Sequence, residues 1–424
     1  MRRFLLPVLA VAAIAAAAAS AAPPESDVRF ATFNASLNRP AAGLLTAHLA
    51  SPNVDDQFRR QAKNVAEVIQ RIRPDVLLIN EFDPLDNVDS NIGPEELFRQ
   101  NFLEVAQNGA LPITEQNGFD YEYEFIAPSN TGIATGKDLN NAGGVVTTPG
   151  APGYGDDSFG FGTFPGQFGM VVYSRYPILY DEVRTFQLFK WKDMPGNLIP
   201  TPFYAPDEVE ILRLSSKSHW DVPIQIGDKV VHFLVSHPTP PVFDGPEDRN
   251  GRRNHDEIRF WADYVSSGRS GYIYDDQGGA GGLKPGELFV IAGDQNSDPL
   301  DGDSIPGAIQ QLTEHPLVNT KATPLSEGAV EAAALQGGAN ATHRSDPRFD
   351  TADFSDTAPG NLRADYVLPR KTLQLVGSGV FWPLRADPLF RLTGTFSFAD
   401  WGLVGGFPTS DHRSVWIDVT VPTE

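Results

Sequence analysis

The stretch Glu287-Leu-Phe-Val-Ile-Ala-Gly-Asp-Gln-Asn-Ser-Asp-Pro299 sets the pattern for the rest of this 424-residue chain. Its apolar run, Leu288 to Ala292, predicts a buried strand, and Gly293 allows the backbone to bend sharply where that strand ends. Asp294 and Asn296 follow, and an extended backbone would place both side chains on one face. A carboxylate and an amide so placed suit a hard cation, an attacking water or a phosphate oxygen. The alternative is an Asx turn that only closes the strand.

The amino terminus indicates a secretory signal peptide over residues 1–21. Two arginines precede an apolar run, and Ala19-Ser20-Ala21 has the small residues of a cleavage site. A retained membrane anchor is the alternative, although no other stretch is long and apolar enough to cross a bilayer. We therefore expect an exported protein, secreted or periplasmic after cleavage, with no stable membrane anchor and one domain over residues 27–424.

Composition narrows the possible functions. The chain has no cysteine, which excludes disulfides and thiolate chemistry. Its formal net charge is −21, and removal of Arg2 and Arg3 with the signal peptide would make it −23. This charge opposes tight, sequence-independent binding to nucleic acid, which relies on a positive surface. It does not oppose catalysis on a phosphoester, because a bound metal ion can reverse the local field.

The first part of the chain predicts a strand, a helix and a second strand. Residues 28–34 form an apolar strand pattern that ends on Asn34, and residues 57–73 have apolar residues at helical spacing up to Pro74. Residues 75–81 then form a second buried strand pattern, which ends on Glu81. This order and spacing predict a βαβ-like unit.

The remaining patterns predict further strands and helices that are separated by long loops. Strands are expected at 121–127, 169–174, 178–186, 209–216, 222–227, 230–237, 362–368 and 414–420, and helical patterns lie near 94–107, 254–267 and 304–314. Residues 35–54 and 381–402 are expected to be loops. Four insertions are expected near 129–168, 240–256, 268–286 and 320–361, the last with weak structure of its own.

Polar residues of the types that act in catalysis or bind metal ions recur where predicted strands begin or end. Each has an ordinary explanation, such as a turn, a salt bridge or a packed edge residue. The ordered set is harder to explain in this way, because a packed sheet fixes the geometry of side chains at its strand ends. The set consists of Asn34, Glu81, His237, Asp294, Asn296, Asp365, Asp411 and His412.

With these residues the chain resembles the endonuclease/exonuclease/phosphatase superfamily, the deoxyribonuclease I-like metal-dependent phosphoesterases. The resemblance implies an α/β fold, a four-layer sandwich in which two mostly antiparallel sheets pack together with helices outside. The matching motifs are Ala31-Thr-Phe-Asn34, Asp75-Val-Leu-Leu-Ile-Asn-Glu81, Leu234-Val-Ser-His237, Ile291-Ala-Gly-Asp294-Gln-Asn296, Arg363-Ala-Asp365-Tyr-Val-Leu368 and Ser410-Asp411-His412.

The resemblance also implies a metal site and a water-activating group. Glu81 would be the main Mg²⁺ ligand, with Asn34 beside it and Asp411 completing the network, and Mn²⁺ or Ca²⁺ are alternatives. Asp294 would orient or deprotonate the attacking water. Asn296 would hold a phosphate oxygen. Independently, Mg²⁺ prefers oxygen ligands and needs only one or two protein carboxylates.

Two histidines are implied to divide the acid and base work. His237 would donate a hydrogen bond or proton on the phosphate side. His412 would be a general base or phosphate ligand, oriented by Asp365. Two residues are weaker candidates for substrate binding. Asn130 is more simply an Asx turn, and Arg213, with the nearby Lys217, is either a cation for phosphate or part of a solvated strand face.

These features predict hydrolysis of phosphodiester bonds by in-line attack of water, with an extracellular nuclease as the first candidate. The alternatives are a phosphomonoesterase or a sphingomyelinase-like lipid phosphodiesterase that scavenges phosphate, and lastly a catalytically silent binding module. The substrate is expected to be a nucleic acid, a small phosphoester or a phospholipid head group, with no protein partner. A lipid enzyme should have an exposed apolar loop, for which Phe381-Trp382 and Phe396 to Trp401 are the candidates.

Overall fold

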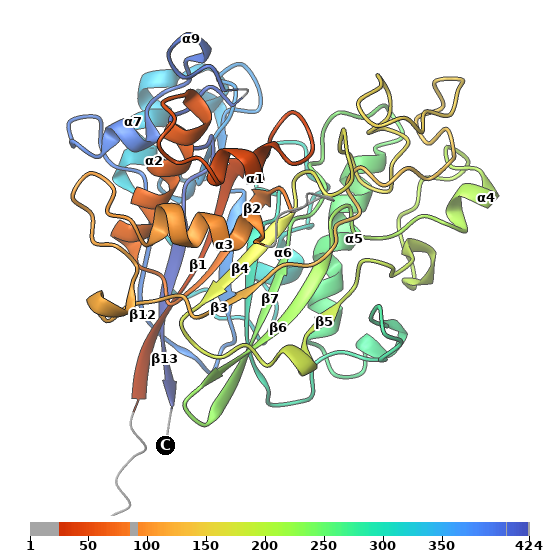
Figure 1. The fold of residues 1–424 in the computed structure, drawn as a ribbon. Coiled ribbons are helices and arrows are strands. Elements are labelled where there is room, and N and C mark those ends of the chain that lie inside the picture. Colours follow the sequence, from red (N-terminus) through yellow and green to blue (C-terminus); the bar gives the residue numbers. More distant parts are fainter. Residues whose placement is uncertain (1–24, 85–91, 404, 423–424) are drawn as a thin grey trace, which may run out of the picture.

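The computed structural model describes residues 25–84, 92–403 and 405–422 (Figure 1). The expected signal peptide, residues 1–21, lies outside this range and stays a prediction. None of the described helices has the length and apolar character needed to span a membrane.

The first sheet joins the two ends of the described chain. Its strand order is β12-β13-β1-β2-β4-β3, and only β1 and β2 run parallel. Helix α2 (Gln57–Ile72) connects these two strands, so the predicted βαβ-like unit is confirmed. The strands are β1 (Glu25–Leu37), β2 (Val76–Phe82), β3 (Tyr123–Phe125), β4 (Met170–Ser174), β12 (Gln374–Val380) and β13 (Val415–Pro422).

The second sheet has five strands in the order β11-β8-β7-β6-β5, and only β7 and β8 run parallel. The segment quoted at the outset forms its strand β8 and the turn that follows. The strands are β5 (Arg184–Thr185), β6 (His219–Ile226), β7 (Lys229–Ser236), β8 (Leu288–Asp294) and β11 (Asp365–Pro369).

Three hydrophobic cores separate four layers. The central core lies between the sheets and includes Phe30 and Phe233, whose rings are 5.6 Å apart. A second core packs α2 and α3 (Pro94–Phe98) on the outer face of the first sheet, and a third packs α5 (Arg249–Tyr264) on the second. Figure 1 shows these helices on opposite outer faces of the paired sheets. The expected four-layer α/β sandwich with mostly antiparallel sheets is confirmed.

Helix α2 also connects the scaffold to the strand ends. Its N-cap, Asp56, accepts a hydrogen bond from the Arg59 amide at 2.9 Å. The Gln61 side chain, on the buried face of the helix, donates to the Ser36 carbonyl (2.9 Å) and to the Thr409 carbonyl (2.7 Å). One buried side chain therefore connects the end of β1 with the loop that precedes β13.

Several element expectations were wrong. Residues 209–216 form no strand of either sheet, because their backbone pairs with residues 189–191 instead, as in the bonds from the Trp191 amide to the Leu212 carbonyl (3.1 Å) and from the Leu214 amide to the Phe189 carbonyl (2.9 Å). The 320–361 insertion has more structure than expected, and the 35–54 and 381–402 loops contain helices. The elements not anticipated are α1 (Leu44–Leu49), α4 (Pro206–Val209), α7 (Glu327–Gln336), β9 (Ala352–Asp353), β10 (Asn361–Leu362), β12, α8 (Phe390–Thr393) and α9 (Phe398–Trp401).

Other expected elements are present but shorter. The strand at 178–186 is reduced to β5, and the helix at 304–314 to α6 (Gln310–Thr313). The helical pattern at 94–107 becomes α3 followed by a π-helical turn, Arg99–Leu103. Apolar spacing marked these segments correctly, and in the 304–314 segment Pro306 and Gly307 limit how far a regular helix extends.

Asp350, in the structured insertion, provides a test of this fold through its pH dependence. Burial, with Asp298, Asp301 and Asp346 nearby, raises the pKa of its carboxyl group to about 8. A carboxyl whose folded-state pKa exceeds its unfolded value destabilises the fold as pH rises through that interval. The free energy of unfolding of Asp350→Asn, relative to that of the wild type, should therefore increase by about 3 kcal/mol from pH 5 to pH 8. Urea unfolding at both pH values measures this difference, and a difference that does not change with pH would contradict the assignment.

Candidate active site

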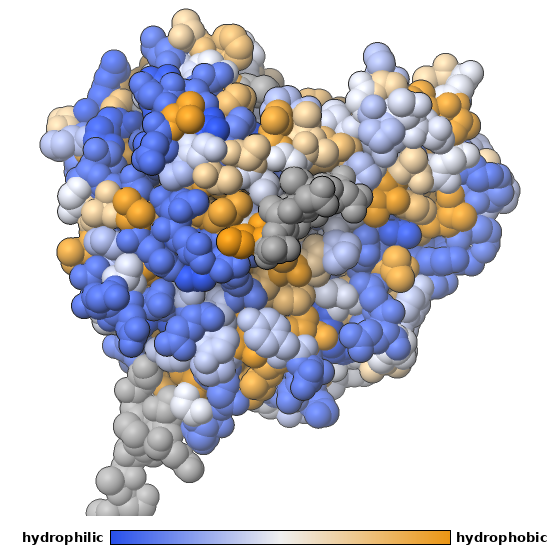
Figure 2. All heavy atoms as spheres, in the orientation of Figure 1, coloured by the Kyte–Doolittle hydropathy of each residue, from blue (hydrophilic) through white to orange (hydrophobic). Residues whose placement is uncertain are grey.

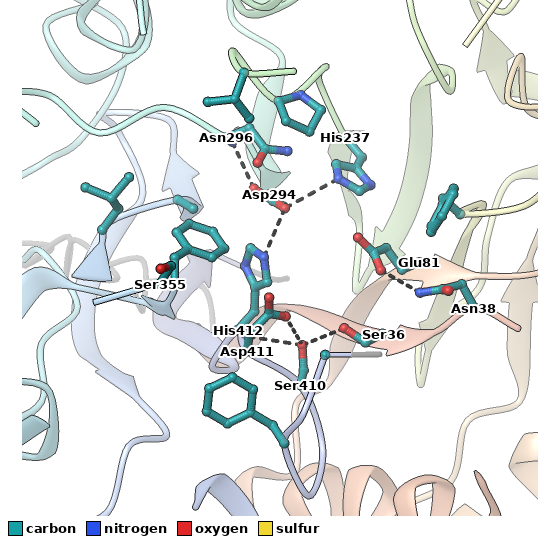
Figure 3. Close-up of a pocket in the computed structure, with 18 of the residues that line it drawn as sticks. Ser36, Asn38, Glu81, His237, Asp294, Asn296, Ser355, Ser410, Asp411 and His412 are labelled. Atoms are coloured by element: carbon teal, nitrogen blue, oxygen red, sulfur yellow. Dashed lines mark hydrogen bonds and ion pairs between the residues drawn. The ribbon is translucent and has the colours of Figure 1, made fainter. Parts of the chain in front are cut away.

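The polar strand-end residues converge at one edge of the two sheets (Figure 3). Strands β1, β2, β7 and β8 bring their carboxyl ends to this edge, and β11 and β13 begin there. In the antiparallel pair β8–β11, Asp294 lies directly opposite Asp365. Residues more than 300 positions apart in the chain, such as Asn34 and His412, therefore face the same space.

The carboxylate of Asp294 is the centre of this arrangement. Its Oδ2 accepts a hydrogen bond from Asn34 Nδ2 at 3.0 Å and lies 3.4 Å from His237 Nε2 and 3.6 Å from His412 Nε2. Burial alone would raise the pKa of Asp294, but His412, His237 and Asn34 together lower it below its usual value. Asp294 is therefore an ionised acceptor at the junction of the two sheets.

The backbone after β8 turns instead of staying extended. A Cβ atom on Gly293 (φ 143°) would lie 2.0 Å from the Ser236 carbonyl oxygen, so only glycine allows β7 to approach this closely. Asn296 has φ 49°, and its amide donates to Asp294 Oδ1 at 2.8 Å. The expectation that both side chains lie on one face of an extended strand was wrong. The segment is an Asx turn and also part of the cavity that contains Asp294.

A chain of buried polar groups leads to Asp294 from the 320–361 insertion. The Thr351 hydroxyl donates to Asp365 Oδ2 at 2.8 Å, and His412 Nδ1 lies 2.9 Å from the same oxygen. Burial raises the pKa of Asp365 to about 6. Burial would lower the pKa of His412, but Asp365 and Asp294 raise it well above its usual value. His412 is therefore an imidazolium held between two carboxylates.

His237 has the opposite electrostatic environment. Burial and the nearby Lys217 ammonium lower its pKa to about 4, so the imidazole is neutral at physiological pH. Its Nδ1 is buried and forms no hydrogen bond with the described residues. Lys217 is only 7% exposed, and its ammonium forms no hydrogen bond or ion pair with any described residue. The sequence offered Lys217 only as an uncertain cation, and the structure places it near both Glu81 and Asp294.

The residues around Glu81 fit a divalent cation. Glu81 has a left-handed backbone (φ 59°), a strained conformation that directs its carboxylate toward the cavity. Oε1 accepts from Asn34 at 3.2 Å and Oε2 from Asn38 at 2.8 Å. Burial and the nearby Asp411 raise the pKa of Glu81. Two neighbouring carboxylates that supply oxygen ligands have the chemistry that a Mg²⁺ site requires.

A second group of possible ligands is already paired internally. One ligand atom from each of Asp294, Asp365 and His412 lies within 4.8 Å of the others. The Asp365–His412 hydrogen bond occupies part of this set, which favours Glu81 over this group for the cation.

Asn130 and Arg213 do not line the cavity. Asn130 Nδ2 donates to the Ser215 carbonyl at 2.8 Å, and Arg213 donates to Asn130 Oδ1 at 2.6 Å. The Arg213 guanidinium also lies 4.1 Å from the Phe159 ring centroid. Their contacts stabilise the 129–168 loop on the segment that carries Lys217, so the structure gives no support to direct substrate binding by either residue.

The site opens into a cavity of about 770 Å³. Its polar floor includes Glu81, His237, Asp294, Asn296, Asp411 and His412. Much of its wall is apolar and comes mostly from loops, with one residue from β10; the apolar lining residues include Pro240, Pro241, Val242, Phe243, Phe354, Leu362, Leu403 and Phe407. Figure 3 shows the labelled floor residues directed toward this common space.

The Thr351 contact generates a test of how His412 is positioned. Removing the hydroxyl in Thr351→Val should lower kcat roughly tenfold, because Asp365 would lose a donor and hold His412 less firmly. Thr351→Ser keeps that donor and should restore most of kcat. Steady-state kinetics with melting curves make the comparison. Equal kcat values in Thr351→Val and the wild type would contradict a positioning role.

Comparison with known proteins identifies the family. The sequence profile described as Endonuclease/Exonuclease/phosphatase family matches residues 31–412. Similar solved structures include an endonuclease/exonuclease/phosphatase from Beutenbergia cavernae DSM 12333 (18% identity, 93% of this chain and 71% of that chain, TM-score 0.45). Another is sphingomyelinase C from Streptomyces griseocarneus (11% identity, 93% of this chain and 99% of that chain, TM-score 0.44). A third is truncated TDP2 from Caenorhabditis elegans (14% identity, 93% of this chain and 98% of that chain, TM-score 0.37). No curated protein matches the sequence. From the profile match over nearly the whole chain, this protein belongs to the Endonuclease/Exonuclease/phosphatase family and is a metal-dependent phosphoester hydrolase.

Proposed function

We propose that this protein is an exported phosphodiesterase that uses a divalent cation and cleaves its substrate by in-line attack of water, without a covalent intermediate. The observation that carries the proposal is the Asp294 carboxylate, which lies between a neutral His237 and a cationic His412. Histidines in opposite protonation states on two sides of one anion can divide proton donation and acceptance during a single displacement.

Each floor residue has a distinct task in this proposal. Asp294, ionised and rich in hydrogen bonds, orients or deprotonates the water. His412 presents a proton at Nε2 toward the phosphate. The neutral His237 donates a hydrogen bond or a proton on the other side of the phosphate. Asn296 binds a non-bridging oxygen from its rigid turn. Glu81, Asn34 and Asp411 would hold Mg²⁺, or alternatively Mn²⁺ or Ca²⁺, which when bound supplies positive charge on the phosphate oxygens.

Lys217 adds a second source of positive charge. Its buried ammonium lies near His237, Glu81 and Asp294. Without the substrate it forms no hydrogen bond or ion pair with any described residue. A desolvated cation of this kind stabilises negative charge more strongly than an exposed one. Lys217 does not line the cavity, so it supports a reaction at an anionic phosphoester through its electric field rather than by contact.

The wall of the cavity favours a lipid phosphodiester over a nucleic acid. Arg39 is the only lysine or arginine among the described residues that line the cavity. Its guanidinium already donates to His48 Nδ1 (3.2 Å), the Asn38 carbonyl (2.8 Å) and Gln61 Oε1 (3.1 Å). A polyanion requires several available cations along its path. The apolar wall instead suits a substrate with one phosphodiester group and an apolar arm, so the lipid alternative moves ahead of the extracellular nuclease.

Export is proposed from the signal-peptide pattern at residues 1–21. The absence of cysteine means that a secreted form would depend on core packing, and the three cores described above supply it. Secretion into the medium and release into the periplasm are both compatible with this pattern.

A substrate panel tests the proposed reaction. Bis(p-nitrophenyl) phosphate, p-nitrophenyl phosphate, DNA, RNA and sphingomyelin would each be assayed with and without EDTA. We expect turnover of phosphodiesters that EDTA abolishes and Mg²⁺ restores. Asp294→Asn and Glu81→Gln should each lower kcat by roughly 10³-fold or more, because the first removes the central anion and the second a metal ligand.

Asp303 provides the matched control. It also lines the cavity but is exposed and lies outside the hydrogen-bonded centre. Asp303→Asn should therefore stay within about twofold of the wild type. Full activity in Asp294→Asn, or turnover that is insensitive to EDTA, would rule out the proposed mechanism.

A further inference from the structure

Among the described residues, four phenylalanine side chains are more than half exposed: Phe161 in the 129–168 loop, and three others. Phe243 is 87% exposed, Phe396 65% and Phe398 60%. They belong to two segments about 150 residues apart, the loop before α5 and the segment that carries α9. Figure 2 shows hydrophobic atoms at the tip of the molecule where Figure 1 places α9. We call these three residues the phenylalanine rim.

Two members of the phenylalanine rim are connected to the catalytic cavity by direct observations, and the third, Phe398, follows Phe396 by two residues at the start of α9. Phe243 itself lines the cavity, and so does Phe407. The Phe396 ring packs edge-on against Phe407, with centroids 6.1 Å apart. Two separate loops therefore place exposed aromatic rings next to the opening through which a substrate must enter. Two segments were expected to be exposed in a lipid enzyme. Phe396, in one of them, is exposed, whereas the side chain of Trp382, in the other, is only 3% exposed.

Phe243 is held in its exposed position. Its backbone is left-handed (φ 65°), a conformation that is strained for a non-glycine residue. Asn250 stabilises the loop on both sides of Phe243. Its side-chain Nδ2 donates to the Val242 carbonyl at 2.6 Å, and its backbone N–H donates to Asp244 Oδ2 at 2.7 Å. Phe243 belongs to none of the three hydrophobic cores among the described residues, so the exposure of its held ring indicates an external apolar partner.

The negative charge of the protein limits which kind of surface can be this partner. The chain has a formal net charge of −21, and the cavity offers no uncommitted lysine or arginine among its described lining residues. An anionic surface would be repelled, whereas a zwitterionic one would not. Aromatic rings are favoured at the interface between lipid head groups and acyl chains. A protein bound across the rim would close the cavity, but a bilayer would present phosphodiester groups to it.

From these observations we propose that the phenylalanine rim docks this protein on a zwitterionic phospholipid membrane. The proposal rests on the phosphodiesterase function above and identifies the physical form of its substrate. The rings insert at the interface, and the cavity of about 770 Å³ then receives a single lipid head group at Asp294. Docking requires no metal and no turnover.

Vesicle flotation tests docking separately from catalysis. Full-length mature Asp294→Asn protein in EDTA would be mixed with phosphatidylcholine vesicles, so that hydrolysis plays no part. We expect the protein to float, and the double substitution Phe396→Ser/Phe398→Ser to reduce the bound fraction at least tenfold. Phe243→Ser should reduce it in the same direction. Vesicles that contain phosphatidylserine should bind the protein less well.

Two controls make the result specific. Leu111→Ser removes a side chain that is 61% exposed beside Arg73, at the opposite end of β2 from Glu81, and should float like its parent. In the active background, Phe396→Ser/Phe398→Ser should keep its kcat/KM on bis(p-nitrophenyl) phosphate, because neither ring lines the cavity.

The outcomes separate the two proposals. Hydrolysis of the soluble diester without flotation overturns membrane docking and leaves the phosphodiesterase intact. Flotation without hydrolysis by the wild type overturns the proposed function and not the docking. Equal flotation of the double variant and its parent, or self-association of the soluble protein that the same substitutions abolish, overturns the assignment of the rim to a membrane.

Discussion

The site depends on one buried anion, the carboxylate of Asp294. Burying an isolated carboxylate is costly, and the cost is offset only if several donors converge on it. Asn34 comes from β1 in the first sheet, His237 follows β7 in the second, and His412 precedes β13. Each donor is supplied by a different strand end. The packing of the two sheets is therefore what makes the charge tolerable, and the charge in turn restricts how the sheets can meet.

The same constraint explains which parts of the site were predictable. Asn34, Glu81 and His237 end apolar strand patterns, so their convergence follows from the periodicity of the strands and from sheet packing. Asn296 was placed incorrectly as an extended residue, because its left-handed turn depends on a hydrogen bond to Asp294 that residue spacing does not reveal. Sequence patterns identify strand ends well and the turns beyond them poorly.

Long-range contacts determine the roles that residue spacing along the chain does not reveal. Thr351 lies in an insertion without periodicity and gains its role only by contact with Asp365. Lys217 shares a Ser-rich segment with Arg213, and burial among groups distant in sequence distinguishes the two. The exposure of Phe243 likewise depends on a backbone conformation that Asn250 stabilises. Such contacts between loops have no local signature, so composition alone could not identify them.

In the proposed mechanism, a centre built from the sheets carries out the reaction and walls built from loops select the substrate. The strand ends are proposed to assemble one cation site at Glu81, beside the Asp294 anion. An anomalous difference map from a crystal soaked in Mn²⁺ tests this most directly. We predict one strong peak bound to the Glu81 carboxylate, with Asn34 and Asp411 adjacent. A saturating soak that leaves Glu81 unoccupied, or a peak bound only between Asp365 and His412, would contradict the account.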